Sequence, residues 1–195
     1  MLTVVGSLKT RTLRVLWLLE EMGEPYESQP SPPRSEEAKA ANASGKVPVL
    51  IDDGHKIADS TAILTYLADK YQKFTFPAGT PERALQDGFT NFALDEFDAC
   101  LWTAARHSFI LPEEMRVPAV KDSLRWEFER SQKIFCDRVG DGPFVMGDTM
   151  TIADIIAAHC GRWARNANFP ISDPRFGDYI ERLLNRPALQ RLLAD

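Results

Sequence analysis

The fold is decided by residues 45–61, which read GKVPVLIDDGHKIADST. A β-branched run over 47–51 predicts a strand, and the Asp-Gly content of 52–55 predicts a hairpin turn. Lys56-Ile57 is then the returning strand. Asp59-Ser60 is a pair of N-cap residue types ahead of apolar residues at helical spacing. The stretch therefore predicts a compact unit of two strands and a helix.

The residues before this stretch predict a strand–helix–strand arrangement. Leu2 to Val5 is an apolar run stopped by a glycine, and Thr12 to Met22 is a leucine-rich helix that ends at Gly23. Pro25 to Gln29 is expected to be an edge-type strand, and a short polar helix follows from Ser35 to about Asn42. The beginning of the chain thus predicts a small α/β layer with a mixed sheet.

The rest of the chain predicts helices alone. We expect the α/β domain over 1–75, a proline- and glycine-containing linker over 76–82, and an all-helical domain over 83–195. Thr151 and Asp154 match a capping box at the start of a buried helix.

Composition excludes several classes of function. The 195 residues are 44% hydrophobic and 26% charged, which is typical of a soluble globular protein, and the net charge of −5 argues against general nucleic-acid binding. Three cysteines, Cys100, Cys136 and Cys160, form an odd set without metal-ligand spacing, so a reducing compartment is expected and no metal site. The beginning of the chain does not resemble a signal peptide and no apolar run could span a bilayer, so we expect a cytoplasmic protein with no membrane partner.

Three segments are candidates for ligand binding. A cis bond at Val47–Pro48 would leave the Val47 backbone free to pair with an extended peptide-like ligand, whereas a trans proline in an edge strand is the alternative. Asp59 and Ser60 suit the ammonium and carboxylate of an amino-acid head group, or are a plain N-cap.

The third segment is the loop SLKTRT over residues 7–12, which places hydroxyl groups near the positive end of a helix. Such a position stabilises a thiolate, including one carried by a ligand. The loop has no cysteine, so no covalent thiol intermediate forms on the protein there. The alternative is ordinary helix capping by Thr10 or Thr12.

Taken together, these segments resemble the glutathione S-transferase family over nearly the full chain. The segments that carry the resemblance are RVLWLLEEMG (14–23), GKVPVL (45–50), DSTAIL (59–64), TIADI (151–155) and RPAL (186–189). The resemblance implies an α/β thioredoxin-like N-terminal domain followed by an all-α C-terminal helical domain.

The resemblance also implies roles for individual residues. Pro48 is expected in the cis form, with the Val47 backbone pairing with the cysteinyl part of glutathione. Asp59 and Ser60 would hold the γ-glutamyl head, and Lys46 would meet the glycine carboxylate. The family forms homodimers, so a homodimer is expected here.

The activating residue of the family is a Tyr, Ser or Cys in the loop after the first strand. Here Thr10 or Thr12 falls near the usual hydroxyl, with Ser7 a few residues earlier. We expect conjugation of glutathione, as co-substrate and without a tightly bound cofactor, to a small apolar electrophile. The electrophile would lie between the domains against Phe92, Asp95, Glu96, Ala99, Arg162 and Trp163. The alternatives are a binding module without turnover and a glutathione-dependent disulfide or peroxide reductase.

Overall fold

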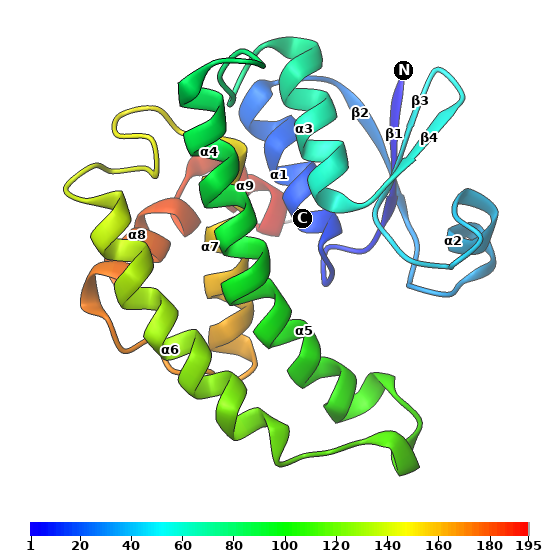
Figure 1. Ribbon diagram of the computed structural model, residues 1–195. Helices are drawn as coiled ribbons and strands as arrows, with labels where there is room; N and C mark the ends of the chain where they lie inside the picture. The colour runs from blue at the N-terminus through cyan, green and yellow to red at the C-terminus, as the bar shows by residue number, and fades with distance from the viewer. Residues whose placement is uncertain (195) are drawn as a thin grey trace. The chain divides into compact units, whose positions relative to one another are not determined.

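The computed structural model describes residues 1–194 (Figure 1). It divides into two compact units. The first contains Met1–Pro77 together with the C-terminal segment from Asn185 onward, and the second is Ala78–Leu184. The elements of the first unit are β1 (Leu2–Gly6), α1 (Thr12–Met22), β2 (Tyr26–Pro30), α2 (Glu36–Ala41), β3 (Val49–Asp52), β4 (His55–Ala58), α3 (Ser60–Tyr71) and α9 (Pro187–Ala194). Those of the second are α4 (Pro81–Phe92), the π-helical turn η1 (Ala93–Asp98), α5 (Ala99–Ala105), the π-helical turn η2 (Arg106–Ile110), the 3₁₀ turn η3 (Glu113–Met115), α6 (Val120–Val139), α7 (Ile152–Asn166) and α8 (Pro174–Leu184).

The first unit contains a four-stranded mixed sheet in the order β2-β1-β3-β4. Strand β1 runs parallel to β2 and antiparallel to β3, and β3 and β4 form the predicted hairpin. The predicted α/β class is confirmed. One boundary differs, because the sequence pattern started a strand at Val47 whereas pairing begins at Val49, opposite Val5. Pro48 has no amide proton to give to the ladder, so the strand starts after it.

Helix α1 is the core of the first unit. Its apolar residues Val15, Trp17, Leu18 and Leu19 have no exposed surface, which explains why the leucine-rich stretch forms a helix here rather than a surface element. The helix ends at Gly23, whose φ of 70° is left-handed and whose amide donates to the Glu20 carbonyl. This is the glycine C-cap that the sequence predicted.

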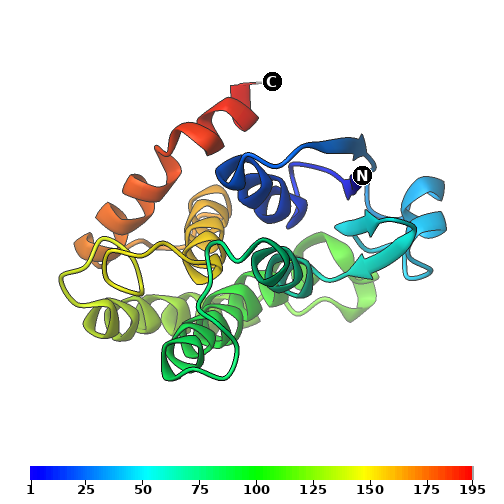
Figure 2. The ribbon, with the colours of Figure 1, turned by 90° about the horizontal axis from the view of Figure 1, so that it is seen from above.

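The C-terminal helix α9 differs from expectation. The sequence pattern assigned all of 83–195 to the helical domain, but α9 packs beside α1 in the first unit, as Figure 2 shows in red and blue. Arg186 donates to both carboxylate oxygens of Glu21, at 2.6 and 2.7 Å, and Leu189 is fully buried. Glu21 and Arg186 are 165 residues apart, and a local hydrophobic pattern contains no information about such a pair. The position of α9 was therefore not predicted.

The helical unit has an aromatic core. Phe97 packs against Phe176 with ring centroids 4.9 Å apart and against Phe128 at 5.1 Å. The predicted capping box is confirmed at the start of α7, where the Thr151 amide donates to Asp154 Oδ2 at 2.8 Å.

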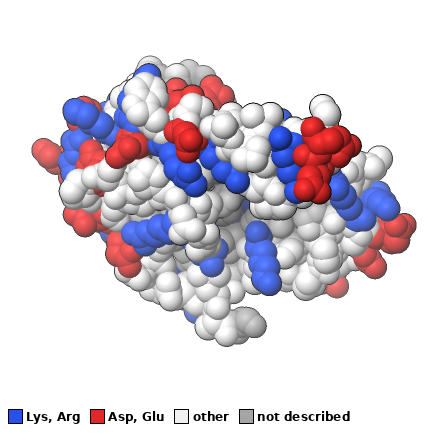
Figure 3. Space-filling model, turned by 90° about the horizontal axis from the view of Figure 1, so that it is seen from below, with Lys and Arg blue, Asp and Glu red and all other residues white. Residues whose placement is uncertain are grey.

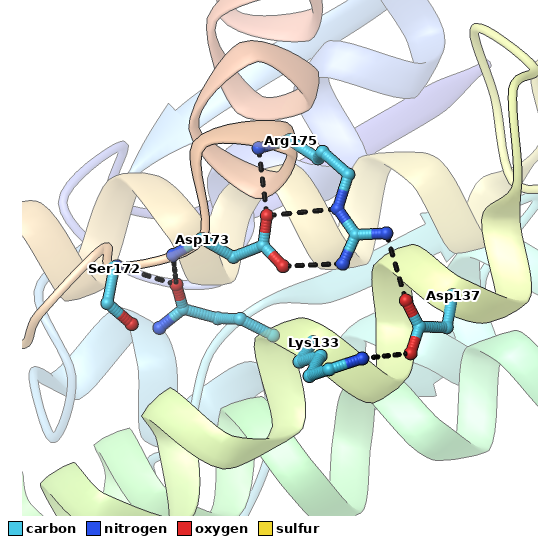
Figure 4. Close-up of polar contacts among 6 residues, drawn as sticks. Lys133, Asp137, Ser172, Asp173 and Arg175 are labelled. Atoms are coloured by element: carbon cyan, nitrogen blue, oxygen red, sulfur yellow. Dashed lines mark hydrogen bonds and ion pairs between the residues drawn. The ribbon is translucent and has the colours of Figure 1, made fainter.

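Polar contacts tie α8 and the segment before it to α6 (Figure 4). Arg175 donates to Asp173 at 2.7 Å and to Asp137 at 2.9 Å, and Lys133 donates to Asp137 at 2.7 Å. Arg175 holds the pKa of the Asp173 carboxyl below its ordinary value. Gln132 accepts from the Ser172 amide at 3.0 Å, so the start of α8 has a fixed position on α6.

The surface carries charges of both signs. Figure 3 shows Lys and Arg interspersed with Asp and Glu over one face, in keeping with the small net charge of −5. Among residues 1–194, no helix combines the length and apolar character that a membrane crossing needs.

Candidate functional site

The Val47–Pro48 peptide bond is cis, as the resemblance implied. Among the described residues, no hydrogen bond uses the Val47 amide or carbonyl, so both groups can still pair with a ligand. The loop before it is fixed, because the Arg34 amide donates to the Gly45 carbonyl at 2.8 Å. Gly45 has φ of +66°, and a Cβ there would lie 3.0 Å from Arg34 Cα, so glycine is required at this position. The segment thus offers an unpaired peptide group at a rigid position.

Lys46 precedes this peptide group and is exposed. Its amide donates to Ser44 Oγ at 3.3 Å and its carbonyl accepts from Asn42 Nδ2 at 3.1 Å. These backbone bonds fix where the side chain starts, while no hydrogen bond or ion pair of the described residues engages Nζ. The ammonium is therefore available to an anion.

Asp59 caps α3, which confirms the N-cap interpretation. Its Oδ1 accepts from the Thr61 amide at 2.9 Å and the Ala62 amide at 3.1 Å. Its φ of 79° is unusual for a residue with a side chain, and such a conformation costs about 1–3 kcal/mol. Since Oδ1 already accepts from two helix amides, Oδ2 of this exposed residue and the amide of Ser60 are the groups that a ligand could use.

Ser60 is the first residue of α3 and is 3% exposed. Arg14 Nη1 donates to Ser60 Oγ at 3.4 Å. A guanidinium has no acceptor, so Ser60 Oγ is the acceptor of this bond and keeps its own proton to donate elsewhere. The sequence did not single out Arg14. The available signal was a charged residue inside the apolar run of α1, where a buried charge is rare.

The three hydroxyl groups of the loop before α1 form a chain. Thr10 Oγ1 donates to the Ser7 carbonyl at 2.7 Å and lies 2.8 Å from Thr12 Oγ1. Because Thr10 uses its single proton on Ser7, Thr12 is the donor in the second bond. Thr12 is fully buried, and a Cβ at Gly6 would lie 2.1 Å from its Oγ1. Thr12 therefore cannot touch a ligand, and its hydroxyl supports Thr10.

Thr10 and Ser7 are the two remaining candidates, and both are partly exposed. Thr10 Oγ1 also accepts from the Thr12 amide at 3.2 Å, which places it at the N-terminal end of α1. The capping interpretation of Thr10 is thus compatible with the thiolate interpretation, because the same oxygen accepts from the helix and carries a proton. Ser7 Oγ accepts from the Lys9 amide at 3.3 Å.

The residues expected to contact the electrophile divide between two directions. The Phe92 ring lies tilted against that of Phe135 of α6, with centroids 6.1 Å apart, and Glu96 accepts from Ser131 of α6 at 2.6 Å. Asp95 and Ala99 are exposed instead. The expectation assumed 3.6 residues per turn, but this segment is π-helical. The wider turn separates 92 and 96 from 95 and 99.

Arg162 and Trp163 lie on α7, which packs against η1. Both are half-buried, and Trp163 lies edge-on to His159 with ring centroids 6.3 Å apart. The expected residues therefore come from the end of α4, from η1, from the start of α5 and from α7, with Phe92 and Glu96 turned toward α6.

The three cysteines all lie in the helical unit. All three are buried and unbonded to one another, as predicted. Burial raises the pKa of the Cys100 thiol to about 12 and that of Cys136 to about 11. Among the described residues, no group of three or more His, Cys, Asp and Glu side chains could hold a metal ion.

Comparison with known proteins gives one consistent family. Residues 11–70 match the glutathione S-transferase N-terminal domain. The chain is 32% identical over 132 residues to glutathione S-transferase theta-2 of Rattus norvegicus, a match that covers 63% of this chain and 52% of the rat protein. It is 29% identical over 202 residues to glutathione S-transferase 1 of Schizosaccharomyces pombe, covering 90% and 87%. The chain thus spans about half the length of its theta-2 relative and most of its yeast relative.

A solved structure agrees along the whole chain. The glutathione transferase URE2P6 of Phanerochaete chrysosporium, in complex with oxidized glutathione, superposes with a TM-score of 0.84 at 25% identity. The match covers 99% of this chain and 94% of that one. With its mixed sheet, its cis Val47–Pro48 bond and its helical second unit, the chain is similar to glutathione S-transferases in sequence and in fold.

Proposed function

We propose that the protein binds glutathione and joins it, through its sulfur, to a small apolar electrophile. The observation that carries the binding step is the unpaired amide and carbonyl of Val47 at the cis proline. An extended ligand that presents its own amide and carbonyl can pair with them in the manner of an added strand. The cysteinyl residue of glutathione presents both groups.

The two ends of glutathione then meet groups of matching charge. The γ-glutamyl ammonium binds Asp59 Oδ2, and its carboxylate binds Ser60. The glycine carboxylate binds the ammonium of Lys46. Support for this arrangement comes from the occupied Oδ1 of Asp59, which leaves only one of its oxygens for a ligand.

Activation of the thiol is assigned to Thr10. A free thiol with a pKa of about 8.5 is only a few per cent thiolate at neutral pH. Thr10 would turn its proton from the Ser7 carbonyl to the sulfur. The Ser7 carbonyl keeps the Thr10 amide as a donor at 2.9 Å, and Thr10 Oγ1 keeps both bonds from Thr12. The switch therefore leaves no buried group unsatisfied.

The size of this effect follows from the bonds exchanged. A hydrogen bond to a charged group contributes about 1.5–3 kcal/mol, and the neutral bond given up contributes about 1 kcal/mol. The net gain of about 0.5–2 kcal/mol lowers the thiol pKa by up to about 1.5 units. The thiol proton passes to solvent, the thiolate forms a bond to the electrophilic carbon, and a displaced halide leaves with the bonding electron pair.

The test uses an aryl halide as electrophile and three variants of the loop. Thr10→Val should lower kcat/KM about 2- to 30-fold and raise the pKa seen in the pH–rate profile, while Ser7→Ala should change neither. Thr12→Val should have a smaller effect than Thr10→Val. Loss of activity in Ser7→Ala alone would move the donor to Ser7, and unchanged activity in all three variants would refute a hydroxyl mechanism.

Retention on immobilised glutathione, reduced by Ser60→Ala, tests the binding step separately. Retention without turnover would identify a binding module, and turnover of a glutathione mixed disulfide or a peroxide in place of the aryl halide would identify a reductase. We expect the active form to be a homodimer, which light scattering in solution would test.

A further inference from the structure

Arg14 is a buried charged residue that lies in the first turn of α1 and reaches α3. Its side chain has no exposed surface, and Nη1 donates to Ser60 Oγ at 3.4 Å. Removing a charged group from water costs several kcal/mol, so an apolar residue would serve a purely structural position at lower cost.

We propose that Arg14 is a positioning residue for the γ-glutamyl carboxylate of glutathione, acting through Ser60. This inference rests on the proposed function and assigns a role to a residue that does not itself touch the ligand. Arg14 fixes the direction in which Ser60 donates and adds a positive charge behind the N-terminus of α3.

Arg14 sets the orientation of the Ser60 hydroxyl. A serine hydroxyl carries one proton and two lone pairs, and a guanidinium can only donate. With one lone pair of Ser60 engaged by Arg14, the hydroxyl proton points away from the guanidinium. A carboxylate, which only accepts, is the partner that this orientation favours.

The backbone at the start of α3 leaves one amide for a ligand. Asp59 Oδ1 occupies the amides of Thr61 and Ala62, so of the first helix amides Ser60 alone remains for a ligand. One ligand carboxylate can thus accept from the Ser60 amide with one oxygen and from the Ser60 hydroxyl with the other. The charge of Asp59 beside this position opposes an anion, and the Arg14 guanidinium offsets that repulsion.

Helix α1 connects the two parts of the proposed site. Thr10 lies two residues before the start of this helix and is assigned to the sulfur, whereas Arg14 lies four residues after Thr10 and is assigned to the γ-glutamyl end. Packing of α1 against α3 brings Arg14 to Ser60. A single helix would then set the distance between the group that holds the sulfur and the group that positions the γ-glutamyl carboxylate.

The test compares two ligands, each titrated calorimetrically against the full chain. One is glutathione, and the other is the tripeptide analogue in which 4-aminobutanoyl replaces γ-glutamyl, so that the ammonium stays and the carboxylate is lost. The ratio of the two dissociation constants measures recognition of the carboxylate. A variant that merely loosens the fold weakens both ligands and leaves the ratio unchanged.

Arg14→Met should reduce this ratio about tenfold, and Ser60→Ala should reduce it similarly. Adding Arg14→Met to Ser60→Ala should give no further reduction, because the two residues act as one unit. The matched control Arg191→Met, at an exposed arginine of the same unit on α9, should keep the ratio of the unmodified protein. Should Arg14→Met fail to fold, Arg14→Lys keeps the charge and loses the guanidinium donor, and its ratio should also fall.

The outcomes separate this inference from the proposed function. If the unmodified protein binds neither ligand at millimolar concentration, glutathione binding itself is refuted. If it prefers glutathione and a folded Arg14 variant keeps the same preference, Arg14 has no part in carboxylate recognition and the inference alone is overturned.

Discussion

Replacing Glu21 should release the C-terminal helix from α1. Its carboxylate lies between the two elements, where Oε1 accepts from Trp17 Nε1 at 2.9 Å and from Arg186 Nε at 2.6 Å. Oε2 accepts from Arg186 Nη2 at 2.7 Å. The Glu21 side chain is 6% exposed and Trp17 is fully buried, so water cannot replace the carboxylate without a rearrangement.

The cost follows from the groups left behind by Glu21→Ala. An indole N–H that loses its partner in the core costs about 1–3 kcal/mol. Loss of the bidentate pair with Arg186, whose side chain is partly exposed, adds up to about 1 kcal/mol. We therefore expect about 1–4 kcal/mol of lost stability, which at a urea slope of about 2 kcal/mol per molar lowers the midpoint by about 0.5–2 M.

Urea unfolding followed by Trp fluorescence and by circular dichroism provides the measurement. Glu24→Ala is the matched control, because Glu24 pairs with the half-exposed Lys73 at 3.2 Å and should cost less than about 1 kcal/mol. Equal midpoints for Glu21→Ala and Glu24→Ala would refute the reasoning, as would an Arg186→Ala change that adds fully to Glu21→Ala instead of overlapping with it.

Three further changes have expected outcomes. Gly6→Ala should lower stability by about 1–3 kcal/mol and also lower activity, since its Cβ would lie 2.1 Å from Thr12 Oγ1. Gly54 also has a positive φ, of +84°, but no atom lies within 4 Å of its Cβ position, so Gly54→Ala should cost less in thermal unfolding. Asp52→Asn should remove an acid-sensitive contribution to stability. Hydrogen bonds from Lys70 and Tyr66 hold the Asp52 pKa below its ordinary 3.8 in the folded state. This contribution is therefore present above pH 4 and is lost as the pH falls through the lowered pKa. An acid-unfolding midpoint unchanged by Asp52→Asn would contradict this. In native protein at pH 8 neither Cys100 nor Cys136 should react with iodoacetamide, because burial raises both pKa values well above 8, and mass spectrometry after denaturation should find both labelled.

The local elements could be predicted because their signals are local. The hairpin at 52–55, the glycine end of α1 and the capping box at Thr151 each depend on residues within a few positions of one another, and all three are confirmed. The same holds for the cis Val47–Pro48 bond, which the resemblance implied from six contiguous residues.

The features that the sequence did not predict depend on distant contacts or on an altered helical period. Helix α9 joins the first unit through Glu21 and Arg186, and periodicity contains no information about which core an amphipathic helix covers. The π-helical turn over 93–98 changes which residues share a face, so Phe92 and Glu96 face α6 although a regular helix would group them with Asp95.

The loop hydroxyls show how structure narrows a choice that sequence leaves open. From sequence, Ser7, Thr10 and Thr12 differ only in position, and any of them could donate to a thiolate. Burial removes Thr12, and its bond to Thr10 makes it a supporting group. Thr10 remains. Its oxygen accepts from both the hydroxyl and the amide of Thr12, and its own proton is donated to the Ser7 carbonyl, which also accepts from the Thr10 amide. A hydroxyl polarised in this way donates more strongly than an isolated one. The bond from Thr12 therefore supports the proposal that Thr10 donates to the thiolate, and the variant that removes the Thr12 hydroxyl measures how much this bond contributes.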